Sequence, residues 1–560
     1  MSQPRSFRRA LKRGILRGAA AAALLAGIAT TGGTAAHATS STDCSIVPLS
    51  GVSLTGTPET VILSGPNASL AASCVDATIL DTYPATGALA VSVADSVVGA
   101  LQSTSGVVVT PDLTVSVQST VAVSTGPHTP SDVFLKETGA DKVAQQGDTG
   151  QGVTVAVLDT GIDGNLPDFA GRLVGGVDLT GEGNPFQDDY GHGTFVAGLI
   201  AGNGASSGGE YSGEAPGANL VSIKVAGATG STDLATVMAG VQWAITNEQT
   251  YGIRVLNMSL GFQPITSTFL NPLDQIVEAA WNDGIAVITS AGNAGPFNGT
   301  ILSPGDDPLA ITVGALDDMA TASINDDEMT NFSSVGPTNP DGWVKPDLVA
   351  SGRSVVSLAD PGSTIYNDYP TARIGSANFV GSGTSFSTAI TSGAAALVIE
   401  AHPGITPDQL KAMLLGTTNP GPIGNPFVDG HGALDALAAV DSTVLGYNQS
   451  LSGLSAVPMG ATVSLANSGP ADTWNPALWT GVTWTGAAWA GSAWDGAAWA
   501  GSAWNGVAWD GAAWASSTWT GAAWAGAAWA GSAWDGAAWA GSAWDGAAWA
   551  GAAWAGSAWA

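Results

Sequence analysis

The sequence has 560 residues, which is too long for a single hydrophobic core and predicts several domains. Lys and Arg number 15 against 45 Asp and Glu, so the formal net charge is −30 at pH 7. Such a negative surface repels nucleic acid and anionic membranes, and it argues against a protein whose function is to bind either.

The N-terminus has the layout of a secretory signal peptide (1–38). A basic run is followed by an apolar stretch rich in Ala and Leu, and the sequence Ala-His-Ala at 36–38 predicts cleavage after residue 38. The apolar run is shorter than the roughly 20 residues that a membrane-spanning helix needs, so a membrane anchor is the weaker alternative. The arginine pair at 8–9 leaves the twin-arginine export route open beside the general one. We therefore expect a secreted protein, either free or retained at the cell surface.

Residues 39–125 predict a small α+β unit. The stretch SVADSVVGALQSTSGVVVTPDLTVSV has the apolar spacing of a helix through Leu101, and it then alternates over 107–117 as a strand does. The two cysteines of the chain, Cys44 and Cys74, lie in this unit. In an exported chain we expect them to form a disulfide. Two free thiols are the alternative, and a metal site is disfavoured because no His or further Cys lies nearby.

Residues 130–441 predict an α/β domain with a doubly wound parallel sheet. The short apolar runs are VTVAVLD, LVSIKVA, RVLNMSLG, IAVITSAGN and LAITVGAL, and helix-length stretches such as LATVMAGVQWAITNE and NPLDQIVEAAWNDG lie between them. Strands that alternate with helices form a parallel sheet covered on both faces. A Gly-, Ser- and Pro-rich linker is expected over 442–473, and a low-complexity repeat tail over 474–560.

Three segments of the α/β domain place a reactive side chain where a strand ends or a helix begins, which is where parallel-sheet folds put their active sites. Asp159 ends the run VTVAVLD, His192 stands between glycines in DDYGHGTFVAGLIAG, and Ser385 begins an Ala-rich helix in GSGTSFSTAITSGAAALV. A lone Asp or Ser at such a position is commonly a turn or cap residue. Together, however, the three supply the carboxylate, base and nucleophile that hydrolysis of a peptide bond by serine requires.

The order Asp, His, Ser along the chain is the order of the subtilisin triad. Residues 130–441 resemble the subtilisin family of serine peptidases in three motifs, AVLDTGID, GHGTFVAG and GTSFSTA. The resemblance implies a subtilisin-like fold, a triad of Asp159, His192 and Ser385, and cleavage of proteins through an acyl-enzyme. It also implies that Asn293, in SAGNAG, donates a hydrogen bond to the oxyanion.

The same resemblance implies where a substrate binds. Two short segments would form the walls of the pocket for the residue before the scissile bond, namely Ser259, Leu260 and Gly261 with Ser290, Ala291 and Gly292. These walls are small or apolar, which predicts an uncharged substrate side chain. Leu302 is placed near the floor of the pocket, which it would shorten. Residues 225–230 are expected to offer an edge strand to an extended substrate.

Members of the family carry an inhibitory, folding-assisting prodomain of the size of residues 39–125, and GVVVTPDLTVSV resembles its closing strand. We therefore expect self-cleavage between Val115 and His128, with an independent binding domain as the alternative. The chemistry requires no cofactor. A structural calcium ion is left open and no metal ligand is assigned, because Asp168, at a position that resembles a family ligand, does not make a calcium site by itself.

The tail places a tryptophan at about every fifth residue from Trp474 to Trp559. A period of five forms no stripe on a helix, and the Asp-Gly and Asn-Gly pairs favour tight turns. A stacked repeat array and a flexible low-complexity tail both fit this pattern. So many exposed indoles would form a sticky surface, which predicts that something covers them: the tail itself, another copy of it, or cell-wall polysaccharide.

The leading hypothesis is a secreted serine endopeptidase of the subtilisin type, activated by removal of its prodomain. Its expected partners are protein or peptide substrates and no nucleic acid. The rival hypothesis is a surface or assembly protein that acts through the Trp tail and uses the peptidase only to mature itself. Multiple turnover of an added protein substrate would separate the two hypotheses.

Overall fold

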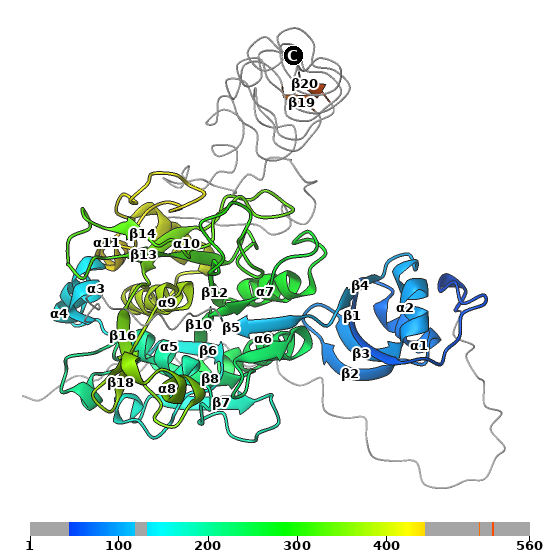
Figure 1. Ribbon diagram of the computed structural model, residues 1–560, viewed down its shortest axis with the longest axis horizontal. Helices are drawn as coiled ribbons and strands as arrows, with labels where there is room; N and C mark the ends of the chain where they lie inside the picture. Colours follow the sequence, from blue (N-terminus) through cyan, green and yellow to red (C-terminus); the bar gives the residue numbers. More distant parts are fainter. Residues whose placement is uncertain (1–43, 118–130, 443–502, 505–517, 520–560) are drawn as a thin grey trace, which may run out of the picture. The chain divides into compact units, whose positions relative to one another are not determined.

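The computed structural model describes residues 44–117, 131–442, 503–504 and 518–519 (Figure 1). The predicted signal peptide lies outside the described residues, and so do nearly all of the predicted linker and tail. Within the tail, β19 (Ala503–Trp504) pairs in parallel with β20 (Thr518–Trp519). Over the described part of the chain, no helix is both long and apolar enough to cross a membrane.

Residues 44–117 form the α+β unit that the sequence predicts, and we call them the N-terminal unit. Its antiparallel sheet has four strands in the order β2-β3-β1-β4. The elements are η1 (Cys44–Ile46), β1 (Pro58–Ser64), α1 (Ala68–Cys74), β2 (Thr78–Tyr83), β3 (Ala88–Ala94), α2 (Asp95–Gln102), β4 (Val108–Pro111) and β5 (Thr114–Val117). Alternate residues of β1 point to opposite faces. Val61 and Leu63 pack with Leu101 of α2, whereas Ile62 points to the other face.

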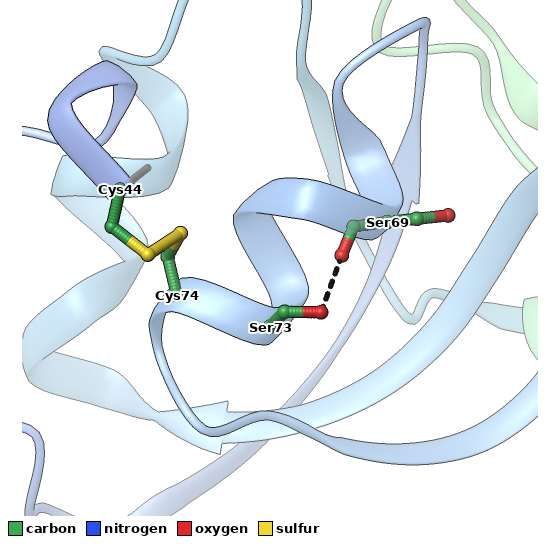
Figure 2. Close-up of a disulfide and its surroundings, with 4 residues drawn as sticks. All are labelled: Cys44, Ser69, Ser73 and Cys74. Atoms are coloured by element: carbon green, nitrogen blue, oxygen red, sulfur yellow. Dashed lines mark hydrogen bonds between the residues drawn. A yellow bond between two sulfur atoms is a disulfide. The ribbon is translucent and has the colours of Figure 1, made fainter. Parts of the chain in front are cut away.

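Cys44 and Cys74 form the predicted disulfide. Figure 2 shows the bridge joining η1 to the last residue of α1. Cys74 is buried in the core of the N-terminal unit, and Cys44 packs at its border.

Residues 131–442 form the central domain, whose main sheet has eight strands in the order β14-β13-β12-β10-β6-β8-β7, with β15 paired to β13. All neighbours are parallel except β13 and β14. The strands are β6 (Thr154–Asp159), β7 (Leu173–Asp178), β8 (Asn219–Lys224), β10 (Ile253–Met258), β12 (Ala286–Ser290), β13 (Ile311–Asp317), β14 (Glu328–Met329) and β15 (Leu348–Ser351). Each of the five predicted apolar runs contains one of these strands. Every residue of β6 and β12 is buried, as expected of a sheet covered on both faces.

Helices cover the two faces of the sheet (Figure 1). Helices α5 and α9 pack together on one face, and α6 and α7 pack together on the other. The helices are α3 (Ser131–Glu137), α4 (Ala140–Gln146), α5 (His192–Ala201), α6 (Leu234–Tyr251), α7 (Pro272–Asn282), α8 (Thr364–Asp368), α9 (Thr384–Ala401), α10 (Pro407–Gly416) and α11 (Ala436–Asp441), with turns η2 (Pro167–Phe169), η3 (Ala205–Ser207) and η4 (Pro370–Ala372). The fold is therefore the predicted doubly wound α/β fold.

Two small sheets flank the main one. The first contains β16 (Val355–Leu358), β17 (Arg373–Ile374) and β18 (Asn378–Gly381). The second contains β9 (Ser231–Asp233) and β11 (Leu260–Gly261), with β5 of the N-terminal unit between them.

The alternation over 107–117 predicts one strand, and this prediction is wrong because the segment contains two strands in two sheets. β4 pairs with β1, whereas β5 pairs antiparallel with both β9 and β11. Pro111 ends β4, since proline has no N–H to donate to a ladder. The Asp112 carboxylate then accepts a hydrogen bond from the Ala235 N–H at 3.0 Å. The chain thus crosses to the start of α6 between the two strands.

The strand order has a reversal at β6. From β6 the chain builds one half of the sheet with β7 and β8, and the other half with β10, β12 and β13. Parallel α/β sheets bind ligands at the carboxyl ends of the strands beside such a switch point. Asp159 is the last residue of β6 and lies at this edge.

Candidate active site

Asp159 and His192 are in direct contact in the interior. Asp159 Oδ1 lies 2.7 Å from His192 Nδ1, and both side chains have no exposed surface. The Thr160 N–H donates to the same carboxylate oxygen at 2.8 Å, which fixes the carboxylate in place. His192 Nε2, the other ring nitrogen, is buried and has no hydrogen-bond partner among the described residues. The imidazole is therefore held through one nitrogen, and the other is available to a substrate or nucleophile.

A second buried carboxylate holds the turn that carries His192. Asp188 accepts hydrogen bonds from the Gly191 N–H, the Thr194 N–H and the Thr160 hydroxyl, each at 2.7 Å. Gly191 directly precedes α5 with φ of 99°, a left-handed conformation that glycine adopts without steric cost. Burial raises the pKa of Asp188, and these hydrogen bonds act against that rise. The Asp188 carboxylate thus connects the end of β6 to the start of α5.

Ser385 is the second residue of α9, a helix of 18 residues. Its hydroxyl donates to the Ser259 carbonyl at 3.1 Å, and the Ser259 hydroxyl donates back to the Ser385 carbonyl at 3.0 Å. Phe386 follows Ser385, and the centroid of its ring lies 5.8 Å from that of the His192 imidazole. Ser385 therefore stands at the positive end of a long helix, beside the Ser259 loop and next to a residue whose ring lies near the histidine.

The orientation of the Asn293 amide is set by Thr384. Asn293 Oδ1 accepts hydrogen bonds from both the N–H and the hydroxyl of Thr384, each at 3.0 Å. Because a side-chain amide has one acceptor and one donor end, its Nδ2 must point the other way. A second bond, from the Gly292 N–H to the Thr384 hydroxyl at 3.2 Å, ties the Asn293 loop to the start of α9.

The two predicted wall segments follow β10 and β12, and all six of their residues are buried. Leu302 packs against both walls. A Cβ added at Gly261 would lie 3.1 Å from the Leu302 Cβ, and one added at Gly292 would lie 2.7 Å from the Leu302 Cγ. A leucine in this position supports the expectation of a short, uncharged pocket.

Strand β5 lies where an extended peptide would pair with this site. Val117 is opposite Leu260 and Ser116 is opposite Gly261, while on the other side Ser116 is opposite Ser231. Val115, opposite the next residue of β9, has no exposed surface. The N-terminal unit therefore covers β9 and β11, the two edges at which we expect a substrate to bind.

The predicted edge strand over 225–230 is wrong in position. β8 ends at Lys224, and the strand that pairs with β5 begins at Ser231. In the preceding loop, the Thr364 hydroxyl donates to the Ala228 carbonyl at 2.9 Å. Within residues 225–230, the Gly230 carbonyl accepts a hydrogen bond from the Val117 N–H of β5 at 3.1 Å.

A small apolar pocket, partly open to solvent, lies beside the histidine. Its walls include His192, Phe195, Phe379 and Phe386. The rings of Phe195 and Phe386 pack with their centroids 4.3 Å apart. The residue next to Ser385 thus supports the imidazole on the side that Asp159 does not contact.

The sequence is similar to those of known proteins. A profile described as the Subtilase family matches residues 150–432. The chain belongs to the subtilase family. Over 312 residues it is 43% identical to serine protease AprX of Bacillus subtilis (strain 168), an alignment that covers 54% of this chain and 70% of AprX. Subtilisin NAT of Bacillus subtilis subsp. natto and a subtilisin of Bacillus pumilus are each 36% identical to it over 308 residues, which is 54% of this chain. The alignment covers 70% of subtilisin NAT and 97% of the B. pumilus subtilisin. This subtilase is therefore a serine-type endopeptidase.

The predicted site residues of the subtilase come together at one edge of the sheet. Asp159, Ser259 and Ser290 lie at or directly after the ends of β6, β10 and β12, and Ser385 comes from the start of α9. Sequence reasoning missed Asp188. The acidic pair before the GHG motif is the signal that could have indicated it, since a carboxylate just ahead of a helix start is suited to accept free N–H groups.

The described residues contain no cluster of three or more His, Cys, Asp or Glu side chains arranged to hold a metal ion. Asp168 is buried, and its carboxylate accepts hydrogen bonds from the N–H and the hydroxyl of Ser206. These bonds tie η2 to η3. A structural calcium ion remains an expectation without assigned ligands.

Because of the buried carboxyl group of Glu214, we expect the stability of the folded protein to depend on pH. Glu214 is buried between α5 and α9. Burial raises the pKa of Glu214 from 4.5 to about 8. The folded state therefore keeps a proton that the unfolded chain loses, and the free energy of unfolding falls as pH rises from about 4.5 to about 8.

The expected result is that the melting temperature of a Ser385→Ala chain, which cannot digest itself, falls between pH 5 and pH 8. Each kcal/mol lost from the free energy of unfolding lowers the melting temperature by about 2–4 °C. Glu214→Gln should reduce this fall, because glutamine does not ionise. Glu210→Gln, in the same loop but exposed, is the matched control. Equal pH dependence in both variants would contradict the role of Glu214.

Proposed function

We propose that this subtilase is a secreted endopeptidase that hydrolyses proteins through Asp159, His192 and Ser385 after cutting off its own N-terminal unit. The observation that carries the proposal is the position of β5. This strand fills the place between β9 and β11, and its register leads toward Ser259, whose carbonyl is 3.1 Å from the Ser385 hydroxyl.

The proposed reaction begins with attack of Ser385 Oγ on the carbonyl carbon of the substrate. His192 Nε2 takes the hydroxyl proton, and Asp159, bonded to Nδ1, keeps the ring in the correct tautomer and stabilises the imidazolium that forms. The imidazolium then protonates the leaving amine, which leaves an acyl-enzyme on Ser385. Water repeats the sequence and releases the acid.

The negative oxygen of the tetrahedral intermediate needs donors. The Asn293 Nδ2 and the Ser385 N–H are suited to this role, because Thr384 orients the amide and α9 begins at the same place. The helix start adds a partial positive charge.

Asn293→Ala is expected to lower kcat by about 10²- to 10³-fold with little change in KM, because the donor acts on charge that develops only in the transition state. The magnitude comes from subtilisin, a relative, and not from this structure. Steady-state kinetics on a peptide substrate measure it. Asn298→Ala, at an exposed position of the same loop, is the matched control. A rise in KM with unchanged kcat would assign Asn293 to ground-state binding instead.

The N-terminal unit is proposed to be an inhibitory prodomain. The unit also binds the central domain through residues outside β5. The Tyr83 hydroxyl donates to the Ala235 carbonyl at 3.0 Å, and the Ala85 N–H donates to the Gln242 side chain at 2.9 Å. Both contacts are with α6. An independent binding domain would not need to occupy the substrate edges, so the pairing favours inhibition.

The register predicts the bond that is cut. Val117 is opposite Leu260, so the next residue, Gln118, is expected opposite Ser259 and beside the Ser385 hydroxyl. Gln118 lies outside the described residues, and it falls within the window expected from the sequence. We predict cleavage between Gln118 and Ser119, and the N-terminal sequence and intact mass of the mature enzyme measure it. A mature N-terminus outside residues 116–128 would show that β5 does not lead its own chain into the site.

Activity on added substrate separates this proposal from the rival one. The enzyme should hydrolyse casein with many turnovers per molecule, whether or not residues 474–560 are present. Cleavage that stops after one self-processing event would instead favour an assembly protein that acts through the tail. Export, surface retention and binding of polysaccharide by the tail remain proposals, and cell fractionation of a chain ending at residue 473 tests retention.

A further inference from the structure

Every cysteine of this protein lies in the N-terminal unit. The chain has two cysteines, Cys44 and Cys74, and they form one disulfide. The central domain, which holds the proposed catalytic residues, has no cysteine. An oxidant or reductant of thiols can therefore act on the N-terminal unit without acting on the catalytic residues.

The disulfide holds a segment with little regular structure. From Cys44 to Thr57 the one regular element is η1. Residues 44–52 make short-range backbone hydrogen bonds, such as that from the Val52 N–H to the Leu49 carbonyl, while the end of the segment bonds to the start of α2, where the Asp95 N–H donates to the Thr57 carbonyl and the Ser96 hydroxyl donates to the Ser53 carbonyl. The segment packs Val47 and its partly buried apolar neighbours onto the core of α1 and α2. The disulfide ties the start of the segment covalently to α1 (Figure 2).

The sheet of the N-terminal unit depends on both of its faces. One face packs on α1, α2 and the segment held by the disulfide. On the other face, Ile62, Tyr83, Ala88 and Ala90 belong to the apolar core of the central domain. Before it docks, the unit therefore has one covered face and a small core. Domains of this size gain much of their stability from crosslinks.

We propose that the Cys44–Cys74 disulfide is a redox checkpoint for maturation. The oxidised N-terminal unit is stable enough to fold, dock on α6 and place β5 beside Ser385. The reduced unit is not, so a chain in a reducing environment stays unprocessed. This inference rests on the proposed role of the unit as a prodomain. The switch lies in the part of the chain that is removed, so thiols should not change the activity of the mature enzyme.

The oxidation needs a disulfide-containing oxidant, either a small disulfide or a thiol oxidoreductase. The thiolate of one cysteine attacks the oxidant and forms a mixed disulfide, with release of one thiol. The other cysteine then attacks its partner in that mixed disulfide and displaces the second thiol. The protein loses two electrons and two protons, and the oxidant gains them.

The main experiment compares the full chain with the double variant Cys44→Ser/Cys74→Ser. Each is refolded from denaturant in oxidised glutathione or in dithiothreitol, and the rates at which processed chain and casein hydrolysis appear are measured. A disulfide that closes a loop of this length shifts a folding equilibrium by about 10²-fold. We expect processing of the wild-type chain to be at least about tenfold slower in dithiothreitol, and the double variant to be equally slow in both conditions.

Ser73→Ala is the matched control. Ser73 precedes Cys74 on α1, and its hydroxyl donates only to the Ser69 carbonyl of the same helix in the described structure (Figure 2). Dithiothreitol should slow the processing of the Ser73→Ala chain as much as it slows that of the wild-type chain. Mature enzyme, once processed, should hydrolyse casein at the same rate with and without dithiothreitol.

A second measurement does not depend on processing. The full Ser385→Ala chain, either with its disulfide oxidised or with it reduced, is exposed to a trace of added thermolysin. Reduction should make residues 44–117 at least about tenfold more susceptible to cleavage, while residues 131–442 stay protected.

The outcomes are distinct. Equal processing of wild type and double variant, or equal protection of the N-terminal unit in both redox states, overturns the checkpoint and leaves the proposed peptidase intact. Absence of processing in the oxidised wild-type chain overturns the proposed function, and the checkpoint with it.

Discussion

Replacing Ser385 with alanine is expected to lower kcat for a peptide substrate by about 10⁶-fold and to leave the N-terminal unit attached to the chain. The magnitude is that of the corresponding change in subtilisin, a relative, and does not come from this structure. The reason is chemical: the substitution removes the hydroxyl that lies beside the Ser259 carbonyl and next to Phe386, whose ring lies near His192. The remaining hydrolysis would come from binding and the oxyanion donors.

Two measurements check this prediction. Single-turnover and steady-state assays on a peptide report the loss in rate, and the mass of the purified chain reports whether residues 44–117 are retained. Ser387→Ala is the matched control, because this serine lies two residues further along α9, is buried, and its hydroxyl has no partner in the described residues. A processed Ser385→Ala chain would mean that another molecule or another residue cuts it.

Replacing Asp159 with asparagine is expected to lower kcat by about 10⁴-fold near neutral pH, by analogy with the same change in the trypsin triad. Asp159 Oδ1 accepts from the Thr160 N–H and contacts His192 Nδ1 at 2.7 Å, and an asparagine side chain of the same shape fits sterically in its place. An amide that presents its NH₂ group to Nδ1 would favour the tautomer with the proton on Nε2. That tautomer cannot accept the proton of Ser385.

The pH profile of kcat/KM, measured from pH 6 to pH 10, tests this prediction. Asp163→Asn is the control, since Asp163 lies four residues beyond Asp159, is only half-buried, and accepts hydrogen bonds from Asn165. A loss of less than about tenfold for Asp159→Asn would mean that tautomer control is not a large part of catalysis.

Much of the fold could be predicted because the central domain is made of local signals. Each apolar run between 153 and 316 contains a strand, since a strand buried on both faces must be apolar throughout. The disulfide was predictable from two cysteines in an exported chain. The candidate triad was predictable because glycines and a small-residue helix flank its members, and because the order of the three motifs is shared with the subtilisin family.

The errors have one cause, which is that pairing between distant segments has no local signal. Pro111 could have indicated that a strand ends within 107–117, but nothing local indicates that β5 pairs with β9 and β11 of another sheet. The edge strand was placed at 225–230 instead of at β9, because the contact that occupies the loop comes from Thr364 in a far segment. Asp188 was missed for a similar reason, as its partners surround it only in the folded chain.

By itself, the sequence determined the class of fold, the family and the candidate catalytic residues, because these depend on periodicity and on short motifs. Only the tertiary structure decided which groups act on each other. It brings Thr384 to the Asn293 amide and Ser259 to Ser385, and it places β5 between β9 and β11. Hydrogen bonds and strand pairs join residues that are far apart in the chain, and their partners are chosen by the packing of the whole domain.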